Sequence, residues 1–280
     1  MGIRIITDTT SDISMEQANE MNITLVPLKV IFGDKEYKEG IDITIEGFYE
    51  KLVKAERLPT TSQPSPDDFL ELFKEGKAAG DSIIVMVIAQ KLSGTYQSAL
   101  IAKEMADYDD IHIIDSHTTT CALRIMVEHA IKLRDKGMNT KEIVSQLMNL
   151  RNRIVLLAMV DTLEYLHKGG RLSKSSAILG TLLKFKPIIN VKEGVIGVVG
   201  KERGVNKAIN RIAEVMDEYG QIDTDYPVHL GYTALDDKCK LLRDKLHEKL
   251  NIEEMKMHPV GCVVGTHAGP GACMVTYVKK

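Results

Sequence analysis

Short apolar runs alternate with amphipathic segments through the first 160 residues of the chain. The runs are rich in Ile, Val and Leu, contain few polar positions, and have the length of single β-strands. Uninterrupted runs of this kind are typical of parallel strands that are covered on both faces. The pattern predicts strands at residues 3–7, 23–32, 82–89, 111–115 and 153–160.

The segments between these runs carry the signals of helix starts. Ser65 is followed by Pro66 and Asp68, which is the order of an N-cap, a first-turn proline and a first-turn acid. Thr140 is the expected cap of a second helix over residues 141–151. Alternation of strands and helices predicts an α/β domain with a parallel sheet over residues 1–160.

The second half has a different pattern. A hairpin around Glu193 and Gly194, an amphipathic helix at 204–219, a strand at 228–233 and a helix at 235–249 precede an apolar strand pair around His267. This order predicts a smaller, mixed αβ domain over residues 161–280. No linker-like segment separates the two domains, so they are expected to pack tightly, with a ligand-binding cleft between them.

Composition excludes several classes of function. The net charge of −3 provides no positive field for nucleic acid, and a chain without Trp and with five Phe offers little surface for base stacking. The four cysteines form no C-x-x-C pair, which favours a reduced, cytoplasmic location. The N-terminus lacks a signal-peptide pattern, and the apolar runs are too short to span a bilayer.

Two hydroxyl-rich segments are candidates for anion binding. Ser93, Gly94 and Thr95 stand between a predicted strand and a helix, where free backbone N–H groups and glycine favour a carboxylate or a phosphate. Thr61 and Ser62 lie in a loop with three prolines at 58–66. The alternative interpretations are an ordinary helix cap at the first segment and a linker at the second.

Three further segments combine glycine, histidine or acids. Residues 7–12 follow the first strand, 167–173 contain two glycines and Arg171 before a predicted helix at 175–183, and His267 stands in a Gly-Pro-Gly turn. A helix cap, a helix connection with a solvated arginine, and a surface histidine are the structural alternatives. No second ligand lies at metal-binding spacing from His267, so no metal site is expected.

Seven short motifs occur together and in order along nearly the whole chain. They are "TDTTSD" (7–12), "TSQPSP" (61–66), "LSGTYQSA" (92–99), "DS" (115–116), "KGGRLS" (168–173), "KPII" (186–189) and "GTHAGPGA" (265–272). Each motif alone is weak, but the ordered combination resembles the DegV family of bacterial fatty-acid-binding proteins. The resemblance implies a two-domain α/β protein that holds one long-chain fatty acid, such as palmitate or stearate, between its domains.

The resemblance also implies a partner and a set of site residues. Members of the family present the acid to a separate fatty-acid kinase, and the acyl phosphate enters phospholipid synthesis; the protein is then a carrier without a cofactor, and not an enzyme. It is compatible with transient membrane contact. Carried onto this chain, the carboxylate-binding positions are Thr61, Ser62, Ser93, Gly94, Thr266 and His267. Arg171 and Arg203 fall in basic segments that are expected to face the kinase.

Two departures from the family pattern bear on the acyl chain. The family often has small residues after "DS" and after "GPGA", whereas this chain has the bulkier segment 117–126 and then Cys273 and Met274. Both changes would reshape a pocket for the tail. The chain length and the saturation of the preferred acid therefore stay open.

Two classes of enzyme are the rival interpretations. A phosphoryl-transfer enzyme would use His267 or an aspartate at position 8, 12 or 115 as acceptor or base. It would also need a metal- or nucleotide-binding motif, which the sequence does not show. An esterase would need Ser93 within reach of His267 and a third group that orients the ring. A small-anion sensor without lipid is a further alternative.

Overall fold

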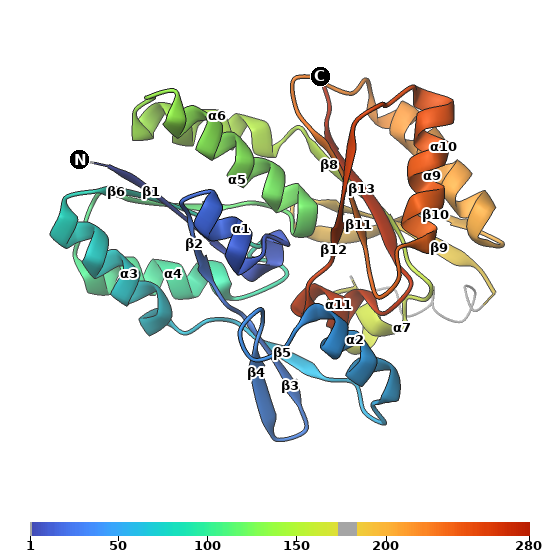
Figure 1. Ribbon diagram of the computed structural model, residues 1–280, viewed down its shortest axis with the longest axis horizontal. Coiled ribbons are helices and arrows are strands. Elements are labelled where there is room, and N and C mark those ends of the chain that lie inside the picture. Colours follow the sequence, from blue (N-terminus) through green and yellow to red (C-terminus); the bar gives the residue numbers. More distant parts are fainter. Residues whose placement is uncertain (1, 173–183) are drawn as a thin grey trace.

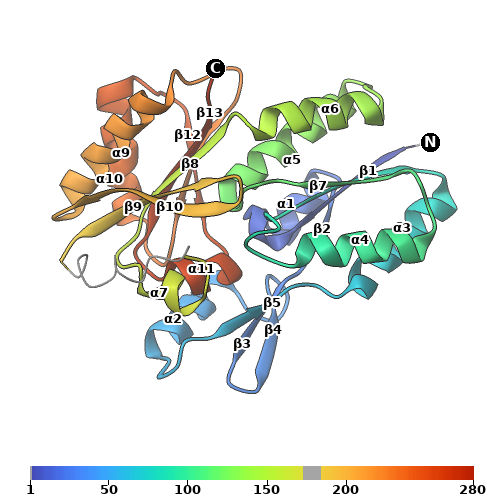
Figure 2. The ribbon, with the colours of Figure 1, turned by 180° about the vertical axis from the view of Figure 1, so that it is seen from behind.

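The computed structural model describes residues 2–172 and 184–280, and within them the strands form a four-stranded, a six-stranded and a three-stranded sheet. Figures 1 and 2 show the four-stranded and six-stranded sheets side by side, with the three-stranded sheet below them. The fold is of the predicted mixed α/β class. The helix predicted at 175–183 lies outside the described residues.

The four-stranded sheet is parallel, as predicted. Its order is β2 (Thr24–Val26), β1 (Ile3–Asp8), β6 (Ser82–Val87) and β7 (Ile111–Asp115). One face packs against α1 (Met15–Glu20), α5 (Thr120–Asp135) and α6 (Thr140–Arg151), and the other against α3 (Pro66–Ala79) and α4 (Thr95–Ala106). A 3-10 turn, η1 (Thr9–Ser11), follows β1.

The helix caps agree with the sequence in one case and differ in two. Ser65 caps α3 in a capping box with Asp68, as its sequence indicated. The cap of α6 is Asn139, one residue before the expected Thr140, because Asn139 pairs with Glu142 in a second capping box. Ser14 caps α1, so no residue of the segment 7–12 caps that helix.

The six-stranded sheet is mixed, and five of its six strands come from the part of the chain for which a mixed αβ arrangement was predicted. Its order is β10 (Val195–Glu202), β9 (Lys186–Lys192), β8 (Ile154–Met159), β13 (Cys273–Val278), β11 (Val228–Tyr232) and β12 (Met255–Pro259). The β9–β10 hairpin is confirmed. Helices α9 (Val205–Tyr219) and α10 (Asp237–Leu250) cover one face of this sheet.

Strand β8 is not part of the first sheet, where its position before residue 160 had placed it. It pairs antiparallel with β9 and β13 in the six-stranded sheet. The strands therefore change sheet before residue 154. An apolar run that is buried on both faces looks alike in either sheet, so its sequence cannot choose the partner strands. The division of the chain into domains at residue 160 stays a prediction.

The smallest sheet contains β4 (Lys35–Lys38), β3 (Lys29–Phe32) and β5 (Thr60–Ser62), and α2 (Ile45–Lys54) packs beside it. The run 23–32 was predicted as one strand, but it divides into β2 and β3, which belong to different sheets. Two short helices complete the described elements, α7 (Glu164–Lys168) and α11 (Cys262–Ala268). No helix among the described residues has the length and apolar character required to cross a bilayer.

The segment around His267 is helical, which corrects the predicted strand pair. Residues 262–268 form α11, and a turn with Gly269 and Gly271 at positive φ leads into β13. Apolar residues in a seven-residue helix and in a strand are equally compatible with the run before His267. The Gly-Pro-Gly turn therefore ends a helix.

Candidate ligand-binding site

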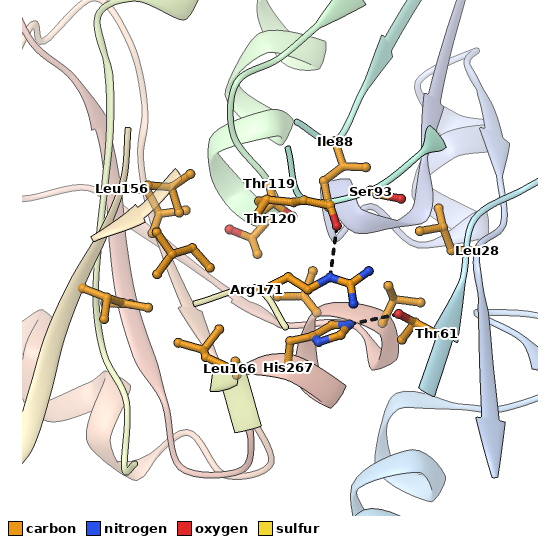
Figure 3. A pocket seen from close by; sticks show the side chains of 18 of the residues that line it. Leu28, Thr61, Ile88, Ser93, Thr119, Thr120, Leu156, Leu166, Arg171 and His267 are labelled. Carbon is orange, nitrogen blue, oxygen red and sulfur yellow. Dashed lines mark hydrogen bonds between the residues drawn. The ribbon is translucent and has the colours of Figure 1, made fainter. Parts of the chain in front are cut away.

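A cavity of about 310 Å³ lies between the end of β6 and the face of the six-stranded sheet that α9 and α10 leave uncovered. This volume is at the lower end of the range of about 300–1,000 Å³ that small-molecule sites occupy. Figure 3 shows side chains from both halves of the chain converging on it. Residues from before and after position 160, such as Thr61 and Ile189, therefore line one cavity.

The wall of the cavity on the side of the six-stranded sheet is apolar. Alternate residues of β8 and the position after it, Leu156, Ala158 and Val160, line the cavity, and Val155, Leu157 and Met159 point into the core under α9 and α10. On β9, Ile189 and Val191 line the same wall. This period of two follows from strand geometry. The run that was predicted to be covered on both faces has a packed core on one face and the cavity on the other.

The opposite end of the cavity is polar. Thr61 and Ser62 of β5, Ser93 and Gly94 before α4, and His267 of α11 all line it. The Oγ1 atom of Thr61 lies 2.9 Å from Nε2 of His267, and Figure 3 marks this hydrogen bond. Five of the six residues named as carboxylate-binding positions therefore surround one cavity, although they come from three segments that are far apart in the chain.

Ser93 and Gly94 form the N-terminus of α4. Gly94 is the N-cap residue and provides no side-chain cap, and the Oγ of Ser93 lies 2.9 Å from the Oγ1 of Thr95. The first N–H groups of a helix carry partial positive charge and lack partners within the helix. The cavity thus has a site at this end that favours negative charge.

The side chain of Gln63 contacts the same helix end, and the sequence did not indicate this residue as part of the site. Its Nε2 donates to the carbonyl oxygen of Gly94 at 3.2 Å and to the Oγ of Ser98 at 3.0 Å. A Cβ on Gly94 would lie 2.0 Å from Oε1 of Gln63, so a larger residue there would displace the end of the Gln63 side chain. The glycine in the "LSGT" segment was the signal that could have indicated a close neighbour.

His267 is held as a neutral imidazole. Burial, with a smaller contribution from the Arg171 guanidinium, lowers the pKa of His267 to about 4. Its Nδ1 atom is buried and has no hydrogen-bond partner among the described residues. A Cβ on Gly169 would lie only 2.2 Å from this Nδ1, so the ring is seated between Thr61 and the backbone of Gly169.

Arg171 lines the cavity, and so it lies beside the residues that were expected to hold a carboxylate. Its Nε donates to the carbonyl oxygen of Leu92 at 3.1 Å, and its Nη1 donates to that of Gly169 at 2.6 Å. Desolvation by burial lowers the pKa of this guanidinium. The polar end therefore holds a cation as well as neutral donors. Whether Arg171 also contacts a kinase stays a prediction.

Thr266 and Arg203 do not reach the cavity. Thr266 is buried, and its Oγ1 donates to the carbonyl oxygen of Cys262 within α11 at 2.9 Å. It is one residue from His267, and neighbouring residues on a helix face different directions. Arg203 is exposed, with its guanidinium 5.1 Å from the centre of the Phe185 ring.

Both segments that depart from the family pattern contribute to the wall. Thr119 and Thr120 line the cavity, as does Met274, and the Oγ1 of Thr120 lies 3.3 Å from the Sδ of Met274. Cys273 points to the opposite face of the sheet, into the core under α9 and α10. Bulk at 119, 120 and 274 therefore narrows the space available to a ligand.

Comparison with known proteins places the chain in a family. The model of the DegV family, described as uncharacterised proteins, matches residues 2–280. A DegV domain-containing protein of Caldanaerobacter subterraneus subsp. tengcongensis is 37% identical over 278 residues, which is 99% of each chain. The chain belongs to the DegV family. The resemblance seen in the ordered motifs is therefore confirmed.

Solved structures of DegV proteins have the same fold. A Thermus thermophilus DegV family protein, described for its fatty acid binding, superposes with a TM-score of 0.92, 30% identity and full coverage of both chains. A stearic acid-binding protein from Eubacterium ventriosum superposes with a TM-score of 0.90 and 28% identity, covering 100% of this chain and 99% of the other.

The three aspartates of the rival phosphoryl-transfer interpretation are absent from the lining of this DegV cavity. Each accepts hydrogen bonds from backbone N–H groups: Asp8 from Thr10 and Ile88, Asp12 from Gly261, and Asp115 from Gln90 and His117. The described residues contain no group of three or more His, Cys, Asp or Glu that could hold a metal ion.

The esterase interpretation also lacks its geometry in this DegV chain. The hydroxyl of Ser93 is paired with Thr95, and the Nε2 of His267 is paired with Thr61. A serine hydrolase requires a carboxylate or amide that orients the second ring nitrogen. Among the described residues, Nδ1 of His267 has no such partner.

Proposed function

We propose that this chain binds one long-chain fatty acid, with the tail against the apolar wall of the cavity and the carboxylate at its polar end. The observation that carries the proposal is the polarity of a single cavity, apolar along β8 and β9 and lined by hydroxyls, a helix N-terminus, an imidazole and a guanidinium at the other end. The fatty acid binding described for the Thermus thermophilus and Eubacterium ventriosum proteins supports it.

The tail supplies most of the affinity in this scheme. Burial of about sixteen methylene groups is worth roughly 12 kcal/mol before costs, at about 0.8 kcal/mol each. The loss of translational and rotational freedom and the ordering of the chain reduce that sum by several kcal/mol. Each hydrogen bond to a charged head group adds about 1.5–3 kcal/mol, part of which only offsets desolvation of the carboxylate.

The head group is oriented by groups that differ in charge. The hydroxyls of Ser93 and Thr61 and the backbone N–H groups at the start of α4 are neutral donors, whereas Arg171 is charged. His267 adds no charge near pH 7, since burial lowers its pKa to about 4. One cation, Arg171, therefore faces one carboxylate. Because the imidazole of His267 beside it is neutral, the site can tolerate a change in the charge of the head group.

Substitution of Ser93 or His267 by alanine is expected to weaken palmitate binding about tenfold to a hundredfold. Each change removes one hydrogen bond to the carboxylate, which is worth about 1.5–3 kcal/mol. Isothermal titration calorimetry on delipidated protein measures the loss. Thr266→Ala is the matched control, because Thr266 neighbours His267 in α11 but does not line the cavity. The palmitate affinity of this variant should equal that of the wild type.

Mass spectrometry of ligand extracted from the purified protein tests the class of ligand directly. The proposal requires one fatty acid per chain. A nucleotide or a sugar phosphate at that stoichiometry, or unchanged palmitate affinity in both Ser93→Ala and His267→Ala, would overturn it.

We further propose that the chain presents its fatty acid to a fatty-acid kinase in the cytoplasm, and does not itself catalyse a reaction. The ordered motifs support this role through the family they identify, and Arg203 supports it as an exposed cation outside the cavity. Arg203→Ala should slow phosphorylation of the bound acid by the kinase of the same organism severalfold and leave palmitate affinity unchanged.

The matched control for Arg203 is Lys207→Ala, which removes an exposed cation from the neighbouring helix α9. Phosphorylation is followed as ADP release in the presence of loaded protein and kinase. Equal rates for the two variants would show that Arg203 has no special part in docking. Acyl phosphate formation without the kinase would contradict the assignment as a carrier.

A further inference from the structure

The helix that carries His267 has no N-terminal cap of its own. Helix α11 spans Cys262–Ala268, its N-cap residue is Gly261, and no side chain within the helix caps it. Free N–H groups at a buried helix start are costly unless another group accepts their hydrogen bonds. The partners of these N–H groups therefore decide how firmly the helix is held.

Two carboxyl groups from the first part of the chain serve as those partners. Oδ1 of Asp12 accepts a hydrogen bond from the N–H of Gly261 at 2.9 Å, and Oε1 of Glu39 accepts one from the N–H of Val263 at 3.1 Å. Glu39 is only 4% exposed. A Cβ on Gly261 would lie 2.3 Å from Oε1 of Glu39, so the two acids occupy the place where a capping side chain of α11 would stand.

Both acids are fixed to the N-terminal half of the molecule. Asp12 has a φ of 56° and follows η1, and its carbonyl oxygen accepts a hydrogen bond from Nη1 of Arg124 at 3.0 Å. The N–H of Glu39 donates to the carbonyl oxygen of Leu28 at 2.9 Å. The start of α11 is thus attached to β1 and β4 segments, although α11 lies directly before β13 of the other sheet.

His267 lies one turn along α11 from Val263, on the same side of the helix. Its ring is seated between Thr61, at 2.9 Å, and Gly169, which leaves no room for even one added carbon. A rotation or shift of a helix of seven residues would move the ring out of that seat. The two acids neither line the tail wall nor touch the polar end of the cavity.

We propose that Asp12 and Glu39 are positioning residues for His267. They cap α11 from the other half of the molecule and so hold the imidazole at the polar end of the cavity. The ligand-binding part of this inference rests on the proposed function, whereas the placement of the ring in the ligand-free protein does not.

The test compares Glu39→Ala with Glu39→Gln. Alanine removes the acceptor, and glutamine keeps an oxygen that can accept from Val263. In protein labelled at histidine Cε1, the NMR signal of His267, assigned by its loss in His267→Gln, should shift in Glu39→Ala and return to its wild-type position in Glu39→Gln. Palmitate affinity should fall about tenfold in the first variant and recover in the second, and affinity for 1-hexadecanol should change less than twofold in either.

Asp12 provides a second pair if Glu39→Ala does not fold. Asp12→Asn keeps the acceptor and tolerates the positive φ, whereas Asp12→Ala loses the acceptor. Asn139→Ala is the matched control, since it removes the cap of α6, a helix none of whose residues lines the cavity, and lowers stability by about 1 kcal/mol. Its His267 signal and its palmitate affinity should be those of the wild type.

Different results would contradict the proposed fatty acid binding and the positioning role of Asp12 and Glu39. Failure of the wild type to bind palmitate removes the proposed function, and the His267 signal still reports on the caps. An unmoved signal in both alanine variants, or equal losses of palmitate and hexadecanol affinity, overturns the positioning role.

Discussion

Gly169→Ala is expected to lower palmitate affinity by one to two orders of magnitude while the fold stays intact. The new Cβ would stand 2.2 Å from Nδ1 and 2.9 Å from Cε1 of His267, so the ring must leave its seat beside Thr61. Loss of the imidazole at the carboxylate costs about 1.5–3 kcal/mol. Gly169 has a φ of −76°, which alanine adopts without strain, so the effect is steric and local.

Calorimetric titration of palmitate and thermal unfolding together test this expectation. Lys168→Ala is the control, because it changes the neighbouring residue of α7 at an exposed ion pair with Glu164, which contributes little to stability. Wild-type affinity in Gly169→Ala would mean that the His267 ring can move without cost, and so that its position does not matter to the head group. A large loss of thermal stability would instead assign the close contact to folding.

The alternation of β8 explains why sequence could predict the architecture and only part of the site. Its continuous apolar run correctly indicated burial on both faces, and the same hydrophobic pattern describes a face packed against helices and a face that lines a cavity. Periodicity reports which residues leave water. It does not report whether protein or ligand covers them, and the family motifs were needed to make that distinction.

Residues at the polar end of the cavity could be predicted where a short motif contained a hydroxyl, glycine or histidine. Contacts between residues far apart in the sequence could not be predicted. Ser93, Gly94 and His267 are visible in the sequence as a hydroxyl, a glycine and a histidine within the ordered motifs. The ring of His267 packs against Gly169, and Asp12 and Glu39 cap the helix that carries it. These contacts join segments about 100 to 250 residues apart. Glycines marked two of these places, at 169 and 261, because close approach excludes a Cβ.

Glu39→Gln should stabilise the protein strongly at pH 8 and much less at pH 5. Burial is the main cause that raises the pKa of Glu39 from 4.5 to about 7, and hydrogen bonds from Thr9 and the α11 backbone offset only part of it. Well below pH 4.5 the carboxyl group is protonated in both the folded and the unfolded state, so it adds no pH dependence. As the pH rises from 4.5 to 7, the unfolded state loses the proton first, and the folded state is progressively destabilised.

The full penalty, reached above pH 7, corresponds to about 3 kcal/mol, and glutamine avoids it because it cannot ionise. Chemical denaturation of the wild type and Glu39→Gln at pH 5 and pH 8 measures the difference, with the exposed Glu50→Gln of α2 as the control. A variant that is less stable than the wild type at both values would show that Glu39 is ionised in the folded state. In that case an ionised Glu39 carboxylate would interact with the partial positive charge at the start of α11. Glutamine is neutral and could not replace it, so Glu39→Gln could no longer restore the position of His267.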